Sequence, residues 1–583
     1  MREKRDDSEA PSSRVAPVAH DSRTTCEETA FKFLHSLLTL LAAVPFLRYS
    51  LTPSFISEPV FSMPLFDVPL LARLQAEFRL SMKRLLNDLC LDLESQYAGV
   101  AKSLALPVAY FRFLGQALER EAYANWKVVG WIEALNDLVY FVDLLQQIRE
   151  EPNPREFAAQ LFAECQEKFF ENCYLDDLFP RGVSQAAGLE RRLNDLCTRL
   201  TQELTQESLC FVPGLPMLWC ASRKLPSWTV ELHLSDNVER GEMLGTMAIG
   251  MEGASCEAPP SVKRALKQSS SQATILVRPR ELSLKIGRTV TPLCTMRGSR
   301  LEWSWTHRPP VMAMEPRSGA VTVGPTLVYG KDRQPRRVAS TSADQVARIG
   351  RAWTIIKEAW PEGQEVLALL TARIIPLKAK GIVSFSYRHR PGLSFINCFD
   401  RNNLDLIDDV IHENSHHHLN LLLRKQILYH GDRNQQIFYS PWRRSLRPLR
   451  GILHAAFTFT MGAMLFERLS TWASGRSGSA RWTRAGLTSH DLQRARFRCL
   501  EEVESVRYSI QDLEYASWHL KWLTGSGQRL VKQLAETIEQ VEHNITPHKK
   551  AVLASTFGPA LRRHVKELQQ ARQTYGPVRV GKV

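Results

Sequence analysis

The chain has no Cys-x-x-Cys pair, although it contains 11 cysteines. No zinc-finger spacing can therefore be formed from its cysteines. Their number is odd and they are scattered, which is typical of reduced thiols in a cytoplasm. They are Cys26, Cys90, Cys165, Cys173, Cys197, Cys210, Cys220, Cys256, Cys294, Cys398 and Cys499. We therefore expect a cytoplasmic protein.

Long apolar runs are missing from the N-terminal region. The longest, residues 33–47, is shorter than 18 residues and contains His35 and Pro45. A membrane span needs about 20 apolar residues, so this run predicts a buried helix and no membrane association. About 30 mostly polar residues precede it, which argues against a cleaved signal sequence.

Nucleotide-binding and nucleic-acid-binding motifs are also absent. The sequence contains neither a GxGxxG pattern nor a P-loop, so nucleotide-dependent chemistry has no support. The formal net charge of +14 favours acidic partners in general. The basic residues are spread out, however, and no RNP motif or basic-aromatic repeat occurs, so we expect no nucleic-acid partner. A peptide substrate, acidic in character, fits this charge equally well.

At 583 residues the chain is long enough for two or three domains. Composition and periodicity predict an α+β, mainly helical fold. Residues 1–28 are polar and rich in Pro and Ser, which predicts a disordered tail. Apolar residues recur every three to four positions over 29–225, which predicts a helical N-terminal domain. Short β-branched runs predict a β-containing middle section over 226–345, and a metal-binding catalytic domain over 346–583 follows.

Two short apolar runs precede the segment that carries the chemistry. Residues 381–388 and 393–399 are separated by His-Arg-Pro-Gly and predict a pair of strands. The second run leads almost directly into a helical pattern. A strand beside a metal-binding helix can hold an extended peptide by main-chain pairing, and residues 393–399 are our candidate for that role.

The helical pattern of residues 404–428 contains the sequence His412-Glu-Asn-Ser-His416. Residues four apart on a helix lie on one face, so His412 and His416 can offer two imidazole nitrogens to one metal ion, with Glu413 beside them. The alternative is a solvated, histidine-rich helix face. His417 and His418 are rotated by about 100° and 200° from His416, so they are not candidate ligands.

The carboxylates of Asp408 and Asp409 lie one turn before His412. They are candidates to accept the second N–H of a metal-bound imidazole. They fit equally well as ordinary acidic residues on a helix face.

Two histidines do not complete a catalytic metal site, so a third protein ligand is needed. The apolar helix predicted over residues 452–469 offers His454 and Glu467. His454 shares a stripe with Phe457 and Met461 and is expected to point inward. Glu467 is rotated by about 220° from His454, toward the expected solvent side. We favour His454, and Glu467 remains the alternative.

The identity of the metal decides the reaction. With zinc, Glu413 would be the general base that activates a metal-bound water, giving a metallopeptidase. With Fe(II), the open positions would bind a 2-oxoacid and dioxygen, and a distal carboxylate would need an anchor. Arginine supplies that anchor best. The segment between the two helices contains four arginines: Arg443, Arg444, Arg447 and Arg450. Its alternative role is a solvated basic loop.

These motifs, in this order and spacing, resemble those of the HExxH-type α-ketoglutarate-dependent peptide β-hydroxylases, a bacterial family associated with the maturation of ribosomally made peptides. The similar pattern covers residues 380–470. It consists of His412, Glu413, His416, Leu419 and Asn420; then Tyr439, Ser440, Pro441, Trp442 and Arg443; then Arg447, Pro448 and Leu449; then Leu453 and His454. His417 and His418 depart from the pattern, because many relatives carry a basic residue after HExxHx.

The resemblance implies iron and 2-oxoglutarate in place of zinc and water, with hydroxylation at Cβ of a peptide residue. It implies that His412, His416 and His454 bind the metal and that Arg443 or Arg447 holds the 2-oxoglutarate carboxylate. Tyr439 and Trp442 belong to the same cofactor-binding segment. Glu413 would then support the metal site and would not act as a proteolytic base.

Three hypotheses therefore stand. The first is an Fe(II)/2-oxoglutarate oxygenase acting on a peptide, such as a ribosomally made precursor. The second is a zinc metallopeptidase that uses Glu413 as its base. The third is a helical scaffold in which the HExxH sequence has no catalytic role.

Overall fold

Helices form most of the fold, at 71% of the described residues in the computed structural model, which confirms the α+β, mainly helical expectation. The structure describes residues 65–118, 120–150, 153–168, 174–180, 188–208, short segments between 228 and 336, 342–430, 435–474 and 477–576. The expected tail over 1–28 and the expected helix over 33–47 lie outside these residues.

The first group of helices precedes the strands. It comprises α3 (Val68–Glu94), α4 (Ala98–Ser103), α5 (Val108–Ala117), the 3₁₀ helix η1 (Arg120–Ala124), α6 (Trp126–Glu150), α7 (Pro154–Lys168), α8 (Tyr174–Leu178) and α9 (Leu189–Ser208). α3 begins where the side chain of Asp67 accepts a hydrogen bond from the backbone N–H of Leu70. That bond satisfies an N–H that has no partner within the helix. α6 is buried on most of its faces and packs against α3 and α9.

Strands occupy the middle of the chain, as the sequence predicts. Five of them form an antiparallel sheet in the order β1-β4-β5-β6-β7. These strands are β1 (Trp228–Leu232), β4 (Ala273–Arg278), β5 (Glu281–Ile286), β6 (Thr289–Arg297) and β7 (Arg300–Trp303). Smaller sheets are made by β2 (Met247–Ile249), β3 (Ala254–Glu257) and β8 (Thr306–Arg308), and by β11 (Val328–Tyr329) and β12 (Pro335–Arg336).

A second five-stranded sheet joins the middle section to the helix that carries the HExxH motif. Its order is β14-β15-β13-β10-β9. These strands are β9 (Met312–Met314), β10 (Val321–Val323), β13 (Arg373–Leu377), β14 (Phe385–Ser386) and β15 (Leu393–Asn397). β14 and β15 pair antiparallel, as predicted, whereas β15 and β13 are parallel. β15 is buried along its whole length and has a strand on each side.

This arrangement corrects the expected peptide-binding strand. A strand that already has a partner on both sides has no free main-chain groups with which to hold a peptide. Residues 393–399 include β15 and therefore cannot serve in that way. The strand at the edge of the sheet is β14.

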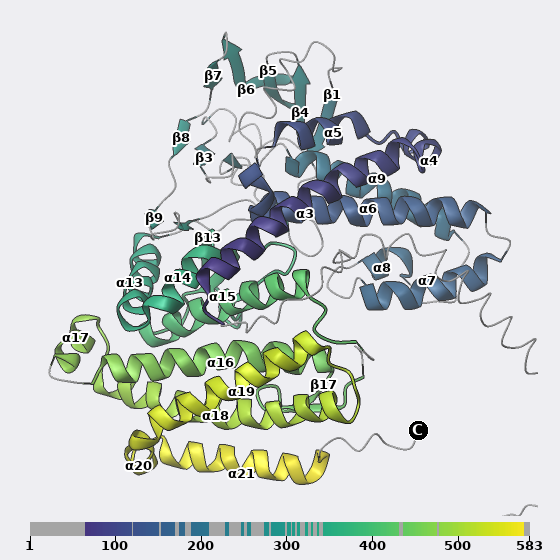
Figure 1. Ribbon diagram of the computed structural model, residues 1–583. Coiled ribbons are helices and arrows are strands. Elements are labelled where there is room, and N and C mark those ends of the chain that lie inside the picture. Colours follow the sequence, from purple (N-terminus) through teal and green to yellow (C-terminus); the bar gives the residue numbers. More distant parts are fainter. Residues whose placement is uncertain are drawn as a thin grey trace, which may run out of the picture. The chain divides into compact units, whose positions relative to one another are not determined.

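The helices after the strands carry the HExxH motif and its neighbours (Figure 1). They are α13 (Ala343–Ala359), α14 (Pro361–Leu370), α15 (Asn403–Lys425), α16 (Leu449–Trp472), α17 (Gly478–Arg484), α18 (Ser489–Trp518), α19 (Gly525–Ile545), η2 (Thr546–His548), α20 (Lys549–Ala554) and α21 (Gly558–Tyr575). A short hairpin of β16 (Phe438–Ser440) and β17 (Ser445–Arg447) connects α15 to α16. α18 packs against α19.

α16 is the central helix of this group. It packs against α13, α15, α18 and α19, and nearly all of its apolar side chains are buried. By length and composition it is the one helix among the described residues that could cross a membrane, but most of it is buried inside the fold. Such burial is typical of the core helix of a soluble protein.

The described residues belong to one compact unit, Phe55–Val583. Three ion pairs connect its N-terminal helices to the region around the HExxH motif. Arg390 pairs with Glu207 of α9, Arg424 pairs with Glu133 of α6, and Lys425 pairs with Glu77 of α3 at 3.1 Å. α3 also packs directly against α15.

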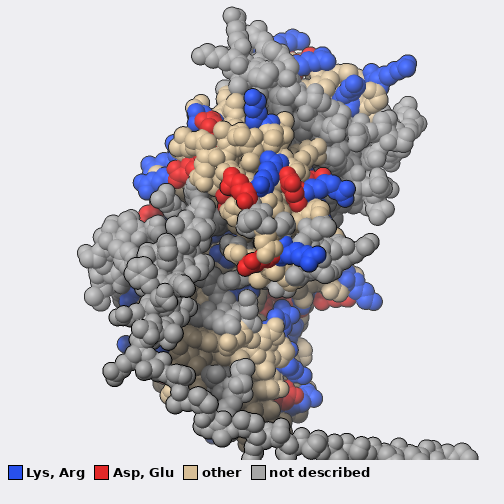
Figure 2. Space-filling view, turned by 90° about the vertical axis from the view of Figure 1, so that its right-hand side faces the viewer, with Lys and Arg blue, Asp and Glu red and all other residues tan. Residues whose placement is uncertain are grey.

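Acidic and basic side chains are interspersed on the described surface in Figure 2. The net positive charge is thus not gathered into one basic patch on this face.

Candidate metal centre

α15 begins at a reciprocal cap that the sequence specifies. The side chain of Asn402 accepts a bond of 2.9 Å from the backbone N–H of Asp405, and the Asp405 carboxylate accepts one of 3.0 Å from the N–H of Asn402. These bonds satisfy two backbone donors that have no partner within the helix. The helix is buried on nearly all sides, so the histidine sequence lies in the interior. The solvated, histidine-rich helix face is therefore excluded.

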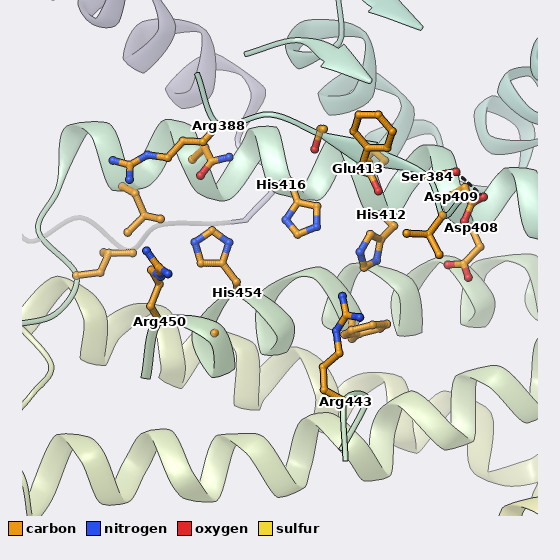
Figure 3. A pocket seen from close by; sticks show the side chains of 18 of the residues that line it. Ser384, Arg388, Asp408, Asp409, His412, Glu413, His416, Arg443, Arg450 and His454 are labelled. Atoms are coloured by element: carbon orange, nitrogen blue, oxygen red, sulfur yellow. Dashed lines mark hydrogen bonds between the residues drawn. The ribbon is translucent and has the colours of Figure 1, made fainter. Parts of the chain in front are cut away.

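His412 and His416 lie one turn apart, as the spacing predicts (Figure 3). Their ring centroids are 4.9 Å apart, and the candidate ligand atoms of His412, Glu413 and His416 all lie within 4.8 Å of one another. Two imidazoles bound to one metal ion, with N–metal distances of about 2.1 Å at roughly right angles, have centroids about 5 Å apart. The observed spacing of the two rings matches that value.

His454 of α16 lies beside His416 and lines the same cavity. The centroids of these two rings are 6.2 Å apart. That separation is about 1 Å longer than for two rings on one metal ion, so His454 would have to move closer to serve as the third ligand. The structure thus brings all three predicted imidazoles together, with Glu413 nearer to the first pair than His454 is.

Glu467 lies on another side of α16 and does not line this cavity. Its carboxylate accepts hydrogen bonds from Thr471 (3.0 Å) and Asn544 (3.5 Å). It is buried, at 4% exposure, so the expectation that it faces solvent is wrong. The expectation fails because α19 packs on that face of α16. Glu467 is thereby excluded as the alternative ligand in this arrangement.

Burial lowers the pKa of all three imidazoles. For His412 and His416 the pKa falls below the ordinary value, and for His454 it falls to about 4, with Arg450 and Arg388 adding to the effect. A neutral imidazole keeps the lone pair that binds a metal ion. The surroundings therefore hold the three rings in the form that binds a cation.

Glu413 is buried at 3% exposure beside the two histidines. Burial raises the pKa of its carboxyl group to about 8, while a hydrogen bond with the Ser386 side chain lowers it. Its Oε2 atom is buried and makes no hydrogen bond among the described residues. Leaving such an atom without a partner is costly, so a cation or a water molecule near it would offset that cost.

The histidines open onto a cavity of about 800 Å³. Besides them, its polar lining includes Arg388, Arg443, Arg450 and Asn420. The Oδ1 atom of Asn420 is buried and, like Glu413 Oε2, has no hydrogen-bond partner among the described residues. Neutral imidazoles, the buried carboxyl group of Glu413 and the unpartnered oxygen of Asn420 form a donor set that fits a divalent transition metal.

The arginines of the segment between α15 and α16 do not all line the cavity. Arg443 lines the cavity, whereas Arg447 is exposed on β17 and does not. Arg447 therefore cannot reach a carboxylate in this cavity as the chain is arranged. Arg450, two residues into α16, does line it. The difference follows from geometry: Arg450 lies one helical turn before His454, while Arg447 precedes the helix on the outer strand of the hairpin.

Tyr439 and Trp442 do not line the cavity either. Tyr439 stacks on Tyr575 of α21, with centroids 5.2 Å apart. Trp442 stacks on Phe459, at 4.2 Å and an angle of 7°, and Phe459 in turn contacts the His412 ring and lines the cavity. Trp442 thus supports the wall of the site from behind, and direct cofactor binding by Tyr439 or Trp442 is not compatible with these positions.

Glu502 of α18 is a residue that the sequence reasoning missed. Its carboxylate accepts a 2.7 Å hydrogen bond from Trp442 Nε1 and pairs with Arg498 at 2.6 Å. Arg498 lies 3.7 Å from Asp408, which precedes His412 by one turn. The signal was present: Cys499, Glu502 and Val506 follow helical spacing on the buried stripe of α18.

The neighbouring histidines and aspartates have separate roles. His417 Nε2 lies 3.1 Å from Ser394 Oγ, and His418 packs edge-on against Phe457, so both point away from the cavity as predicted. Asp409 accepts a 2.8 Å bond from Ser384 and pairs with Arg401 at 3.4 Å. The Asp409 carboxylate is therefore occupied by Ser384 and Arg401. Asp408 is the carboxylate whose charge raises the pKa of His412, against the lowering effect of burial.

No protein-family model matches this chain, and no curated protein matches it.

Proposed function

We propose that this protein is an Fe(II)- and 2-oxoglutarate-dependent oxygenase that hydroxylates a peptide. The observation that carries the proposal is the grouping of three neutral imidazoles and two cavity-lining arginines without ion-pair partners. Neither Arg388 nor Arg443 has a carboxylate within ion-pair distance among the described residues. The resemblance of residues 380–470 to peptide β-hydroxylases supports the same conclusion.

His412, His416 and His454 would hold the metal. Iron together with 2-oxoglutarate supplies, when bound, the activation of dioxygen that hydroxylation requires. Arg443 is the anchor that we assign to a 2-oxoglutarate carboxylate, because its guanidinium lines the cavity on the side of His412 (Figure 3). Arg447, the other candidate, is not assigned this role because it is exposed and does not line the cavity.

The protein's own residues would orient the reactants and limit water. Phe459 provides an apolar wall against His412, and Trp442 holds that wall in place. Glu413 and Asn420 present buried oxygens to the cavity. These groups can accept hydrogen bonds from a substrate backbone or from ordered water. We place the protein in the cytoplasm, where its peptide substrate, such as a ribosomally made precursor, would be available in unfolded form.

Binding and turnover of 2-oxoglutarate test this proposal. Purified protein should bind one Fe(II) per chain under anaerobic conditions and then 2-oxoglutarate, and admission of oxygen should give succinate. His412→Ala and His416→Ala should each lower iron affinity by a hundredfold or more, because each removes a direct ligand, and His454→Ala should lower it by about tenfold or more. His543→Ala, at an exposed position on α19, is the matched control. Absence of both iron binding and succinate formation would refute the proposal.

One observation favours a second function, a zinc metallopeptidase. Glu413 lies within the group of candidate ligand atoms and has an unpartnered oxygen, as a base acting on a metal-bound water would need. In that case Glu413→Gln should abolish cleavage of a peptide while the zinc content stays the same. An unchanged cleavage rate would reject this function. If purified protein holds no stoichiometric metal, both enzyme proposals fail and the scaffold hypothesis stands.

A further inference from the structure

The mouth of the cavity carries exposed apolar side chains. Val383 is 65% exposed and Ile427 is 60% exposed, and both line the cavity. Ile382, next to Val383, is 46% exposed. Single exposed apolar residues are ordinary, but a group of them around one opening marks a surface that binds another molecule.

The strand that follows these residues has a free edge. β14 pairs with β15 on one side and is the last strand in the order of its sheet among the described residues. Residues 383–386 line the cavity. An edge strand turns alternate N–H and C=O groups outward, where an extended chain can pair with them. Because Ser386 lines the same cavity as His412, Glu413 and His416, this edge lies beside the histidine group.

A positively charged side chain, that of Arg388, lies just beyond the end of this strand. Arg388 lies two residues beyond β14, is exposed, lines the cavity, and has no ion-pair partner among the described residues. Two acids on the cavity wall are engaged elsewhere: Asp409 by Ser384 and Arg401, and Asp408 by Arg498. The third, Glu413, is buried at 3% exposure beside the histidines. A peptide lying along β14 would therefore meet an uncompensated cation.

We propose that an acidic peptide segment binds in extended form along the outer edge of β14. Its main chain pairs with residues 383–386, its apolar side chains cover Val383 and Ile427, and an acidic side chain pairs with Arg388. This inference rests on the proposed function for the existence of a peptide substrate, and it adds how that peptide is held and which side chains are selected. Arg443 remains the residue that we assign to a carboxylate of 2-oxoglutarate.

Main-chain pairing distinguishes this mode from attraction of charge alone. The probe is a fluorescein-labelled nonapeptide, Gly-Val-Asp-Val-Asp-Val-Asp-Val-Gly, whose binding is followed by fluorescence anisotropy with the full chain. Two companions are used: the same peptide with Lys in place of Asp, and the same peptide N-methylated at alternate residues so that it cannot donate to a strand. The parent peptide should bind at least about tenfold more tightly than either companion.

Substitutions at the mouth of the cavity test which residues select the peptide. Arg388→Glu should weaken binding of the acidic peptide by about tenfold and strengthen binding of the Lys peptide, which a merely structural role would not do. Val383→Asp should weaken both. Arg484→Glu makes the same charge change at an exposed position on α17 away from the cavity and should alter neither. Circular dichroism and the melting temperature show whether each variant is folded.

Three outcomes would overturn the inference. Equal binding of the N-methylated and parent peptides would exclude pairing with the edge strand. Equal binding of the acidic and Lys peptides would exclude selection by Arg388. Displacement of the acidic peptide by 2-oxoglutarate at concentrations that saturate the metal site would assign Arg388 to the dicarboxylate instead.

The peptide test needs no turnover, so it separates this inference from the proposed function. Peptide binding as expected without succinate formation would leave the edge-strand site standing and remove the oxygenase. Succinate formation without selective peptide binding would do the reverse. His416→Ala should lose metal and keep peptide affinity, because it is not part of the β14 edge.

Discussion

Two histidines four residues apart dominate this protein at the scale of single residues. Their spacing alone predicts one helix face, and the structure places their rings at a distance suited to one metal ion. What the spacing does not give is the third ligand, because His454 and Glu467 come from a different helix. The packing of α16 points His454 into the cavity and Glu467 against α19.

Gly392 is a single residue on which the hairpin before α15 depends. Its φ is +88°, and a Cβ added there would lie 3.1 Å from the Leu370 carbonyl oxygen and 3.3 Å from the Ala372 nitrogen. We expect Gly392→Ala to lower the free energy of unfolding by roughly 2 kcal/mol or more, since both the backbone and the close contact resist a side chain. Chemical denaturation measures this value.

Gly381 provides the matched control. Its φ is +76°, but a Cβ there would have no heavy atom within 4 Å. Gly381→Ala should therefore carry only the conformational cost, about 1 kcal/mol. If the two variants are equally stable, the close approach of Gly392 to the α14–β13 segment does not matter for stability.

At the scale of elements, α18 supports the candidate metal centre through Glu502. This residue is 1% exposed, and burial raises the pKa of its carboxyl group to about 7, against the lowering effects of Arg498 and Trp442. Glu501 and the charge of Asp408 from α15 raise it further. An acid whose pKa is higher in the folded than in the unfolded state binds its proton more tightly when folded. Its contribution to stability is present below about pH 4 and is lost as pH rises through 7.

Replacing Glu502 by Gln removes this titration. The free energy of unfolding of Glu502→Gln, measured relative to the unsubstituted chain, should therefore rise between pH 5 and pH 8 by roughly 2–3 kcal/mol. Urea denaturation at several pH values measures it. Glu536→Gln, at a side chain 62% exposed on α19, is the matched control. A flat difference for Glu502→Gln would show that its carboxyl group titrates normally.

At the scale of the whole molecule, buried ion pairs hold the N-terminal helices to the region around the HExxH motif. The side chains of Arg390 and Glu207 are 2% and 9% exposed. Removing one partner of a buried pair leaves the other charge uncompensated, so Glu207→Ala should lower the free energy of unfolding by about 3–5 kcal/mol. The unsubstituted chain should unfold without the N-terminal helices melting first.

The exposed pair of Lys532 and Glu536 is the control for that change. Their side chains are 77% and 62% exposed and lie 3.7 Å apart. Glu536→Ala should change stability by about 0.5 kcal/mol or less. Calorimetry of both variants gives the comparison, and a separate early transition of the N-terminal helices in the unsubstituted chain would contradict the expected coupling.

Local patterns in the sequence were enough to predict many elements. The helical stripes of α15 and α16 and the hairpin of β14 and β15 follow from spacing and from capping or turn residues. The helical periodicity expected over residues 29–225 does not show that residues 108–150 divide into α5, η1 and α6. The periodicity continues across these breaks, which is why it did not reveal them.

The sequence by itself determined that a helix presents His412 and His416 on one face, because that depends only on the rise and turn of a single helix. Tertiary structure alone decided that Arg443 lines the cavity and Arg447 does not, that Trp442 lies behind Phe459, and that β14 forms the open edge. The physical reason is that side-chain direction within one element follows from local geometry. Which surfaces meet depends instead on the packing of segments far apart in the chain, and no local pattern records it.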